Sequence, residues 1–144
     1  MLAAMILSEL NWLAIAVAFL AFFVIGAIWF APKTFYPVWV KAMGTDPQKA
    51  ANAHGPALTF GLTAVGAAVQ VIALAIVLHF VAASGPVGPL GGLLVGLLLG
   101  VGIAAASTLS HRLFAGHGLR VWAIEAGGDI VSLAVAGLLL GLFG

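Results

Sequence analysis

Charge is scarce in this sequence. Its 144 residues include five basic and four acidic side chains, so only 6% of the chain is charged, while 64% is hydrophobic and the mean hydropathy is +1.26. A soluble domain carries about a quarter of its residues as charged side chains, because a polar surface must separate its core from water. The composition therefore excludes a water-soluble fold and predicts an integral membrane protein in contact with the lipid bilayer.

Cysteine is absent altogether, which excludes disulfides, thiol catalysis and Cys-ligated metal sites. Clusters of basic residues are also missing, so we expect no nucleic-acid partner. His111 and His117 lie six residues apart and match no common zinc-binding pattern. The serines have no histidine and acid at triad-like positions. We expect no metal and no cofactor, and the sequence favours a function other than catalysis without deciding the question.

Four apolar segments are long enough to cross a bilayer, which requires about 20 helical residues. Proline, glycine or polar residues separate them, and none alternates between apolar and polar residues as a membrane strand would. We expect a single all-α domain over residues 1–144. It is predicted to be a bundle of four transmembrane helices with antiparallel neighbours, at about 12–30, 56–83, 89–109 and 121–143.

All five basic residues fall in two of the predicted loops. Lys33, Lys41 and Lys49 follow the first span, and Arg112 and Arg120 follow the third. By the positive-inside bias both loops face the cytoplasm, and both termini lie outside, in the inner membrane of a bacterium. Residues 1–7 are interpreted as an interfacial lead-in to the first span, with Ser8 or Asn11 as its N-cap.

The first basic loop contains a helix-start signal. Residues 45–48 read Thr-Asp-Pro-Gln, which has the form of a capping box with proline in the first turn. We expect a short amphipathic helix at about 46–53 that lies along the headgroups. It is either a plain connector or a lid or docking element.

Small residues recur every four positions in the third span, which predicts close helix packing. Whether the opposing helix belongs to the same chain or to another copy stays open, and we expect a homo-oligomer. A second membrane protein is a further possible partner. The series consists of Gly92, Gly96, Gly100, Ala104 and Thr108, and the fourth span offers Gly137 and Gly141.

Two acids lie within the fourth span, where ionisable groups are costly and usually functional. Glu125 and Asp129 are one helical turn apart, and Ser132 extends their face. Two carboxylates this close in a low dielectric resist double ionisation, which would allow them to share a proton. The alternative is a structural clip in which Arg112 pairs with Glu125. Further candidates for a polar pathway are Ser107, Thr108 and His111 on the third span and Gln70 on the second. The pathway would continue to His79 and Asn11 near the outer face.

Several stretches resemble one known family. Residues 11–15 read NWLAI, residues 26–30 read GAIWF, and residues 124–127 read IEAG. Together with Pro32 and Trp39 they are similar to the bacterial and fungal membrane family known as domain of unknown function 1761. The resemblance covers nearly the whole chain and implies a four-helix integral membrane protein without an established activity. The sequence departs from the family's pattern at Asp129.

The favoured function is a small transporter or channel-like protein for a proton, an ion or a small solute, with an intramembrane acidic site. This hypothesis depends on the two acids of the fourth span. The alternative is a structural or accessory membrane subunit that binds a partner helix through the groove from Gly92 to Thr108.

Overall fold

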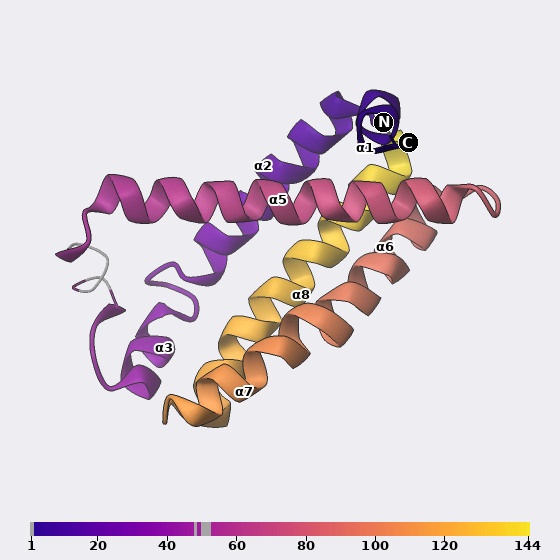
Figure 1. The fold of residues 1–144 in the computed structure, drawn as a ribbon. Helices are drawn as coiled ribbons and strands as arrows, with labels where there is room; N and C mark the ends of the chain where they lie inside the picture. The colour runs from indigo at the N-terminus through magenta and orange to yellow at the C-terminus, as the bar shows by residue number, and fades with distance from the viewer. Residues whose placement is uncertain (1, 48, 50–52) are drawn as a thin grey trace.

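The structure is a computed structural model that describes residues 2–47, 49 and 53–144. The described residues form helices and connecting loops, without a strand (Figure 1). The elements are α1 (Leu2–Glu9), α2 (Trp12–Trp29), α3 (Tyr36–Met43), α5 (Pro56–Ala82), α6 (Gly88–Leu99), the π-helix η1 (Gly100–Ala105), α7 (Ala106–Phe114) and α8 (Gly118–Phe143).

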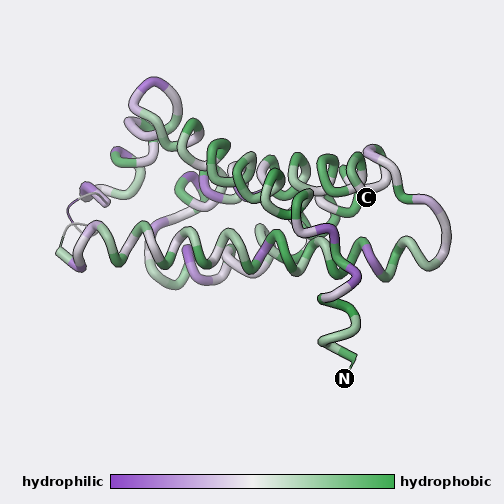
Figure 2. The backbone as a smooth tube through the Cα atoms, turned by 90° about the horizontal axis from the view of Figure 1, so that it is seen from above, coloured by the Kyte–Doolittle hydropathy of each residue, from purple (hydrophilic) through white to green (hydrophobic). Residues whose placement is uncertain are grey.

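Four continuous helical segments are long and apolar enough to cross a membrane, as the sequence predicted. They are Trp12–Trp29, Pro56–Ala82, Gly88–Phe114 and Gly118–Phe143. Figure 2 shows hydrophobic residues along their whole length, with hydrophilic residues concentrated near the turns. Large apolar side chains also cover the outside of the bundle; Leu13 is 76% exposed and Leu98 is 68% exposed. Such a surface requires hydrocarbon as its solvent, so the chain is an integral membrane protein.

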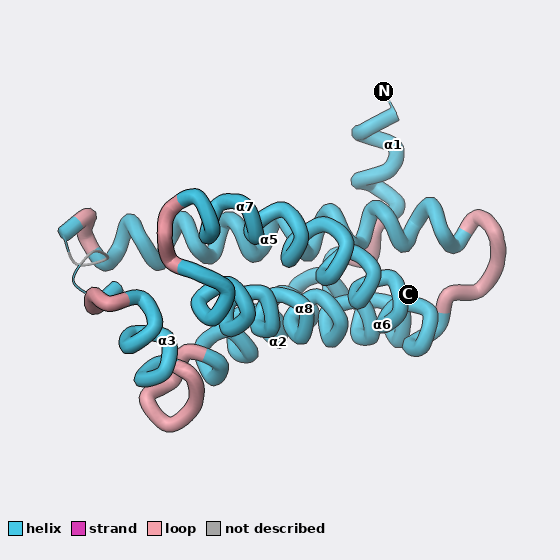
Figure 3. The backbone as a smooth tube through the Cα atoms, turned by 90° about the horizontal axis from the view of Figure 1, so that it is seen from below, coloured by secondary structure: helices cyan, strands magenta, loops and turns pink. Residues whose placement is uncertain are grey.

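The two ends of the bundle differ in composition. Both termini lie at one end, together with the turn that joins α5 to α6 (Figures 1 and 3). We call this the terminal end. The opposite end carries α3, the turn between α7 and α8, and the basic residues Lys33, Lys41, Arg112 and Arg120. We call it the basic end.

Helices α6 and α8 pack backbone against backbone. A Cβ atom built on Gly92 would overlap the carbonyl oxygen of Gly137, and one built on Gly96 would overlap the carbonyl oxygen of Leu133. Gly141 is equally close to Gly88. Only glycine permits this approach, and close packing of small residues is the main attraction between helices in lipid. The groove on the third span is thus filled by α8 of the same chain.

This packing covers the glycine part of the face that the alternative function would use. A partner helix could use the face from Gly92 to Gly100 only by displacing α8. Farther along the same face, Thr108 turns its hydroxyl back to its own helix and donates to the carbonyls of Ala104 and Ala105, at 3.2 and 3.1 Å. The accessory-subunit hypothesis, in which a partner helix uses the whole face from Gly92 to Thr108, stays a prediction from the sequence.

The third span is not one regular α-helix, contrary to the sequence prediction. Its middle is the π-helix η1 (Gly100–Ala105), and the indole N–H of Trp122 donates to the Ala105 carbonyl at 2.7 Å. π-Helical turns widen the backbone and are often found near functional sites. The helix then continues to Phe114, past the predicted end near Leu109, because serine, histidine and arginine do not stop a helix. It ends before Gly116, whose φ is 79°.

Helix α5 packs along only half of its length. Its buried residues all lie between Ala67 and Leu78, and the stretch from Pro56 to Gly66 buries none. The first half of α5 is not buried because α5 crosses the other long helices at a steep angle (Figure 1). The half of α5 nearer the basic end therefore diverges from α2 and α8 and leaves space between the three helices.

The short elements at the two ends were only partly predicted. Asn11 is the N-cap of α2, since its Oδ1 accepts the Ala14 N–H at 3.1 Å, and the preceding lead-in is the helix α1. Helix α3 was not predicted; it has proline in its first turn and ends at Gly44 with a φ of 79°. The predicted amphipathic helix at about 46–53 falls on residues 48 and 50–52, which lie outside the described residues.

Candidate functional site

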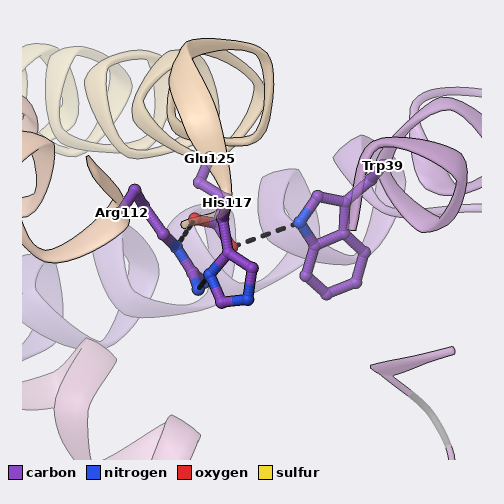
Figure 4. Close-up of polar contacts among 4 residues, drawn as sticks. All are labelled: Trp39, Arg112, His117 and Glu125. Carbon is purple, nitrogen blue, oxygen red and sulfur yellow. Dashed lines mark hydrogen bonds and ion pairs between the residues drawn. The ribbon is translucent and has the colours of Figure 1, made fainter. Parts of the chain in front are cut away.

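An ion pair with two further hydrogen-bonding partners joins α7, α8 and α3 at the basic end (Figure 4). Arg112 donates from Nε to Oε1 of Glu125 at 2.6 Å and from Nη2 to Oε2 at 2.5 Å. Trp39 donates its indole N–H to Oε2 at 3.2 Å. Nη1 of Arg112 also lies 2.9 Å from Nδ1 of His117, which must accept because a guanidinium can only donate. We call these four residues the clip.

Glu125 is thus fully occupied. A two-point fork with arginine is the strongest geometry available to a carboxylate, and here it compensates the Glu125 charge directly. The side chains of Arg112 and Glu125 are only 27% and 19% exposed. The pairing of Arg112 with Glu125 was anticipated from the sequence. The proton shared between Glu125 and Asp129 is not supported by this geometry, because both Glu125 oxygens are bound elsewhere.

The partner histidine differs from the one expected. His111 is exposed on α7, and none of the hydrogen bonds found among the described residues joins it to either acid. His117 takes that place, because it ends the turn between α7 and α8 and faces Arg112. Sequence reasoning treated His117 only as a possible metal ligand. The sequence could have indicated this contact, because His117 follows Arg112 by five residues and lies just beyond the end of the same helix.

Trp29 connects α2 to α8 beside the clip. Its indole N–H donates to the Ile124 carbonyl at 2.7 Å. Its ring covers Gly127 and Gly128, where an added Cβ would lie 2.9 and 3.0 Å from ring atoms. The sequence analysis missed this role of Trp29. The paired glycines after Glu125 were the available signal, because they leave a flat surface for a large ring.

Asp129 is not part of the clip and lines a cavity of about 820 Å³ between α2, α5 and α8, whose wall also includes Trp39. In the part of the chain that the structure describes, no side chain or backbone N–H forms a hydrogen bond or ion pair with its carboxylate. Two other candidates, Ser132 and Gln70, line the same cavity. The lining is completed by Phe22, Phe23, Gly26, Ala27, Phe30, Ala31, Pro32, Tyr36, Trp39, Pro47, Thr59, Phe60, Thr63, Gly66, Ala67 and Gly128.

Ser107 and Thr108 do not reach this cavity. Ser107 donates to the Ala104 carbonyl at 3.1 Å, and Thr108 binds carbonyls of the same turn. Serine and threonine commonly satisfy their hydroxyls in this way within helices. The structure therefore brings Asp129, Ser132 and Gln70 together and places Ser107, Thr108 and His111 elsewhere.

Aromatic rings form the part of the cavity nearest the basic end. The ring of Trp39 lies 4.7 Å from that of Phe30 and 6.1 Å from that of Tyr36, measured between centroids. All three residues line the cavity. Because the N–H of Trp39 is bound to Glu125, the clip holds this indole in place. The clip is thus a supporting structure for the cavity wall.

A second cavity, of about 500 Å³, lies at the terminal end. It is lined by parts of α2, α5 and α8 near the termini, and at its rim His79 faces Glu9 with an Nε2–Oε2 distance of 3.2 Å. Asn11 donates from Nδ2 to the Phe143 carbonyl at 3.2 Å. The two cavities are separated by a layer of side chains with at most 1% exposure, namely Ala18, Val71, Leu74 and Ala136.

The polar pathway considered from the sequence is therefore interrupted. Asp129 and Gln70 belong to one cavity, and His79 and Asn11 belong to the other. Within the described ranges, no three His, Cys, Asp or Glu residues are grouped so that they could hold a metal ion. What Asp129 offers chemically is one negative charge, or one exchangeable proton, on the wall of a largely apolar cavity.

The comparisons with known proteins identify one family. A sequence model of the family described as "Protein of unknown function (DUF1761)" matches residues 13–141. No curated protein and no solved structure matches the chain. The match covers all four membrane-spanning segments apart from a few residues at each end.

Proposed function

The chain belongs to the DUF1761 family, and from its own residues we propose that it is a small membrane transport protein for a proton, an ion or a small solute. Asp129 is its intramembrane binding group. Glu125, the other acid of α8, has a structural role in this proposal, because Arg112 compensates it.

A single observation carries the proposal: the Asp129 carboxylate faces an open cavity without a partner among the described residues. A charged side chain inside a bilayer costs about 3 kcal/mol or more, so such residues are rare and usually line pathways for ions or protons. Where the role is structural, a partner is expected next to the acid, as Arg112 is next to Glu125. Asp129 bears the free-energy cost of a charge inside the bilayer and has no such partner among the described residues.

The arrangement of the cavities favours a carrier over an open pore. One cavity opens toward each end of the bundle, and between them the side chains of Ala18, Val71, Leu74 and Ala136 exclude water. Ser132 lines the first cavity and Leu140 the second, so the apolar layer spans about 12 Å along α8, at about 1.5 Å per residue. A solute bound at Asp129 could cross only if helices moved, as in alternating access.

Ion flux into liposomes that contain the purified protein tests this proposal. We expect wild-type protein to carry a current of protons, sodium, potassium or the small organic cation tetraethylammonium above that of empty liposomes, and Asp129→Asn to abolish it. Asp129→Glu is the matched control, because it keeps a carboxylate on the wall of the same cavity and should retain the flux. A wild-type flux equal to that of empty liposomes, or an undiminished flux with Asp129→Asn, would contradict the proposal.

A further inference from the structure

We infer that the solute of the Asp129 cavity is a hydrophobic organic monocation, such as a protonated amine or a quaternary ammonium or phosphonium ion with apolar substituents. This inference rests on the proposed transport function, and it names the chemical class of solute that the cavity takes. The charge, the aromatic surface, the size and the access of the cavity each support it.

The charge of the cavity selects a monocation. Asp129 is the one formally charged side chain among the described residues that line it, and no lysine, arginine or histidine contributes to the wall. An anion would meet an uncompensated carboxylate in a low dielectric, where like charges repel strongly. A cation with one charge neutralises Asp129 and leaves no excess charge inside the bilayer.

The aromatic surface favours an organic cation. Phe30, Tyr36 and Trp39 form a contiguous group of rings on the cavity wall, and Phe22, Phe23 and Phe60 add further rings. The face of an aromatic ring attracts ammonium and similar cations, most strongly where water is excluded. The clip also keeps the Trp39 ring in one orientation, because Glu125 accepts its N–H.

The volume of the cavity also favours an organic cation. A volume of about 820 Å³ falls within the range of small-molecule sites, about 300–1,000 Å³. An inorganic divalent ion would need about six oxygen ligands close together. Here the side-chain oxygens on the wall come from three different helices, α3, α5 and α8, and most of the remaining wall is apolar.

The cavity is accessible from the side as well as from the end. Phe60, Thr63 and Gln70 lie on α5 at its edge, and all three are exposed, Phe60 by 54%. This is the region in which α5 diverges from α2 and α8. A hydrophobic cation that has partitioned into the bilayer can therefore reach Asp129 without first crossing a soluble vestibule.

Calorimetric titration of the detergent-solubilised protein with tetraphenylphosphonium tests the inference. We expect wild-type protein to bind this cation, and Asp129→Asn to weaken binding at least about tenfold, since the attracting charge is lost. Asp129→Glu, which keeps the charge, and Glu9→Gln, which lies outside the cavity, should bind like the wild type. Phe30→Leu should weaken binding severalfold, because it keeps apolar volume and removes a ring face.

Neutral triphenylphosphine oxide is the matched ligand control, and thermal unfolding of each variant shows that it is folded. Equal affinity for the neutral compound, or undiminished binding to folded Asp129→Asn, would overturn the inference. If Asp129-dependent flux of protons or inorganic ions occurs without tetraphenylphosphonium binding, the inference fails and the transport function stands. If tetraphenylphosphonium binds through Asp129 while no cation enters liposomes, the ligand class stands and transport fails.

Discussion

At the scale of single residues, the chain contains two membrane acids with opposite surroundings. Glu125 binds Arg112 through both oxygens and receives the N–H of Trp39, whereas Asp129 faces a cavity. Glu125, whose charge is compensated by Arg112, therefore lies only one helical turn from Asp129, which has no such partner among the described residues. The difference is made by Arg112 of α7 and the indole N–H of Trp39 of α3, which both bind Glu125.

Removing both partners of the Arg112–Glu125 ion pair should destabilise the protein by less than the two single removals added together. Arg112→Gln and Glu125→Gln each leave a half-buried group without its ion pair, and we expect each to lower the free energy of unfolding by on the order of 1–3 kcal/mol. The double variant should cost less than the sum of the two. Unfolding by detergent titration measures the coupling, and Arg120→Gln, at an exposed position of α8, is the control. Strict additivity would contradict a direct interaction.

Tyr36 provides a test of the contact between α3 and the loop that follows it. Its hydroxyl donates to Oδ1 of Asp46 at 2.7 Å, and this hydrogen bond, followed by burial and the Asp46 charge, raises the pKa of Tyr36 above its ordinary value of 10.0. Because the folded pKa is the higher one, the contact stabilises the fold below pH 10.0 and is lost as the pH rises through the folded pKa.

Titration of tyrosinate absorbance measures this directly, since the chain contains a single tyrosine. We expect Asp46→Asn to lower the pKa of Tyr36 toward 10.0, because the negative acceptor is removed. An identical titration curve for wild type and Asp46→Asn would show that the contact is not formed.

At the scale of helices, α6 and α8 form the most tightly packed pair, and glycine makes this possible. Gly92→Ala and Gly96→Ala would each place a methyl group on the backbone of α8, which cannot move aside as a side chain can. We expect each to lower the free energy of unfolding by roughly 1–3 kcal/mol, the usual cost of overpacking. Gly66→Ala is the matched control, since nothing lies within 4 Å of a Cβ there.

Gly66→Ala should leave stability unchanged or raise it by up to about 1 kcal/mol, because alanine loses less backbone entropy than glycine in a helix. Unfolding of the three variants in the same detergent gives the comparison. Equal stability of all three would contradict the close approach of α6 and α8.

At the scale of the whole molecule, the orientation in the membrane is predicted by charge. Because the chain lacks cysteine, single introduced cysteines can be labelled without background. We expect Ser84→Cys, in the turn at the terminal end, to react with a membrane-impermeant maleimide in bacterial spheroplasts. Lys33→Cys, at the basic end, should react only after the membrane is opened. The reverse pattern would contradict the predicted topology.

The sequence by itself determined the membrane environment, the four spans and the family, and it offered the pairing of Arg112 with Glu125 as one of two alternatives. These depend on composition, on the length of apolar runs and on residues that a short turn must bring together. It also predicted that helices approach closely. Small residues at every fourth position form a smooth face on a helix, whatever the helix packs against.

Only the tertiary structure decided what those features contact. It placed α8 of the same chain against the glycines of α6, gave Glu125 partners that Asp129 does not share, and brought Gln70 of α5 to the cavity that Asp129 lines. It also showed the π-helical turn and the roles of Trp29, Trp39 and Trp122. In hydrocarbon nearly every face of these helices is apolar, so hydrophobic periodicity cannot specify which face turns inward or at what angle α5 crosses. Those choices depend on close packing and on a few interhelical hydrogen bonds between residues far apart in the chain.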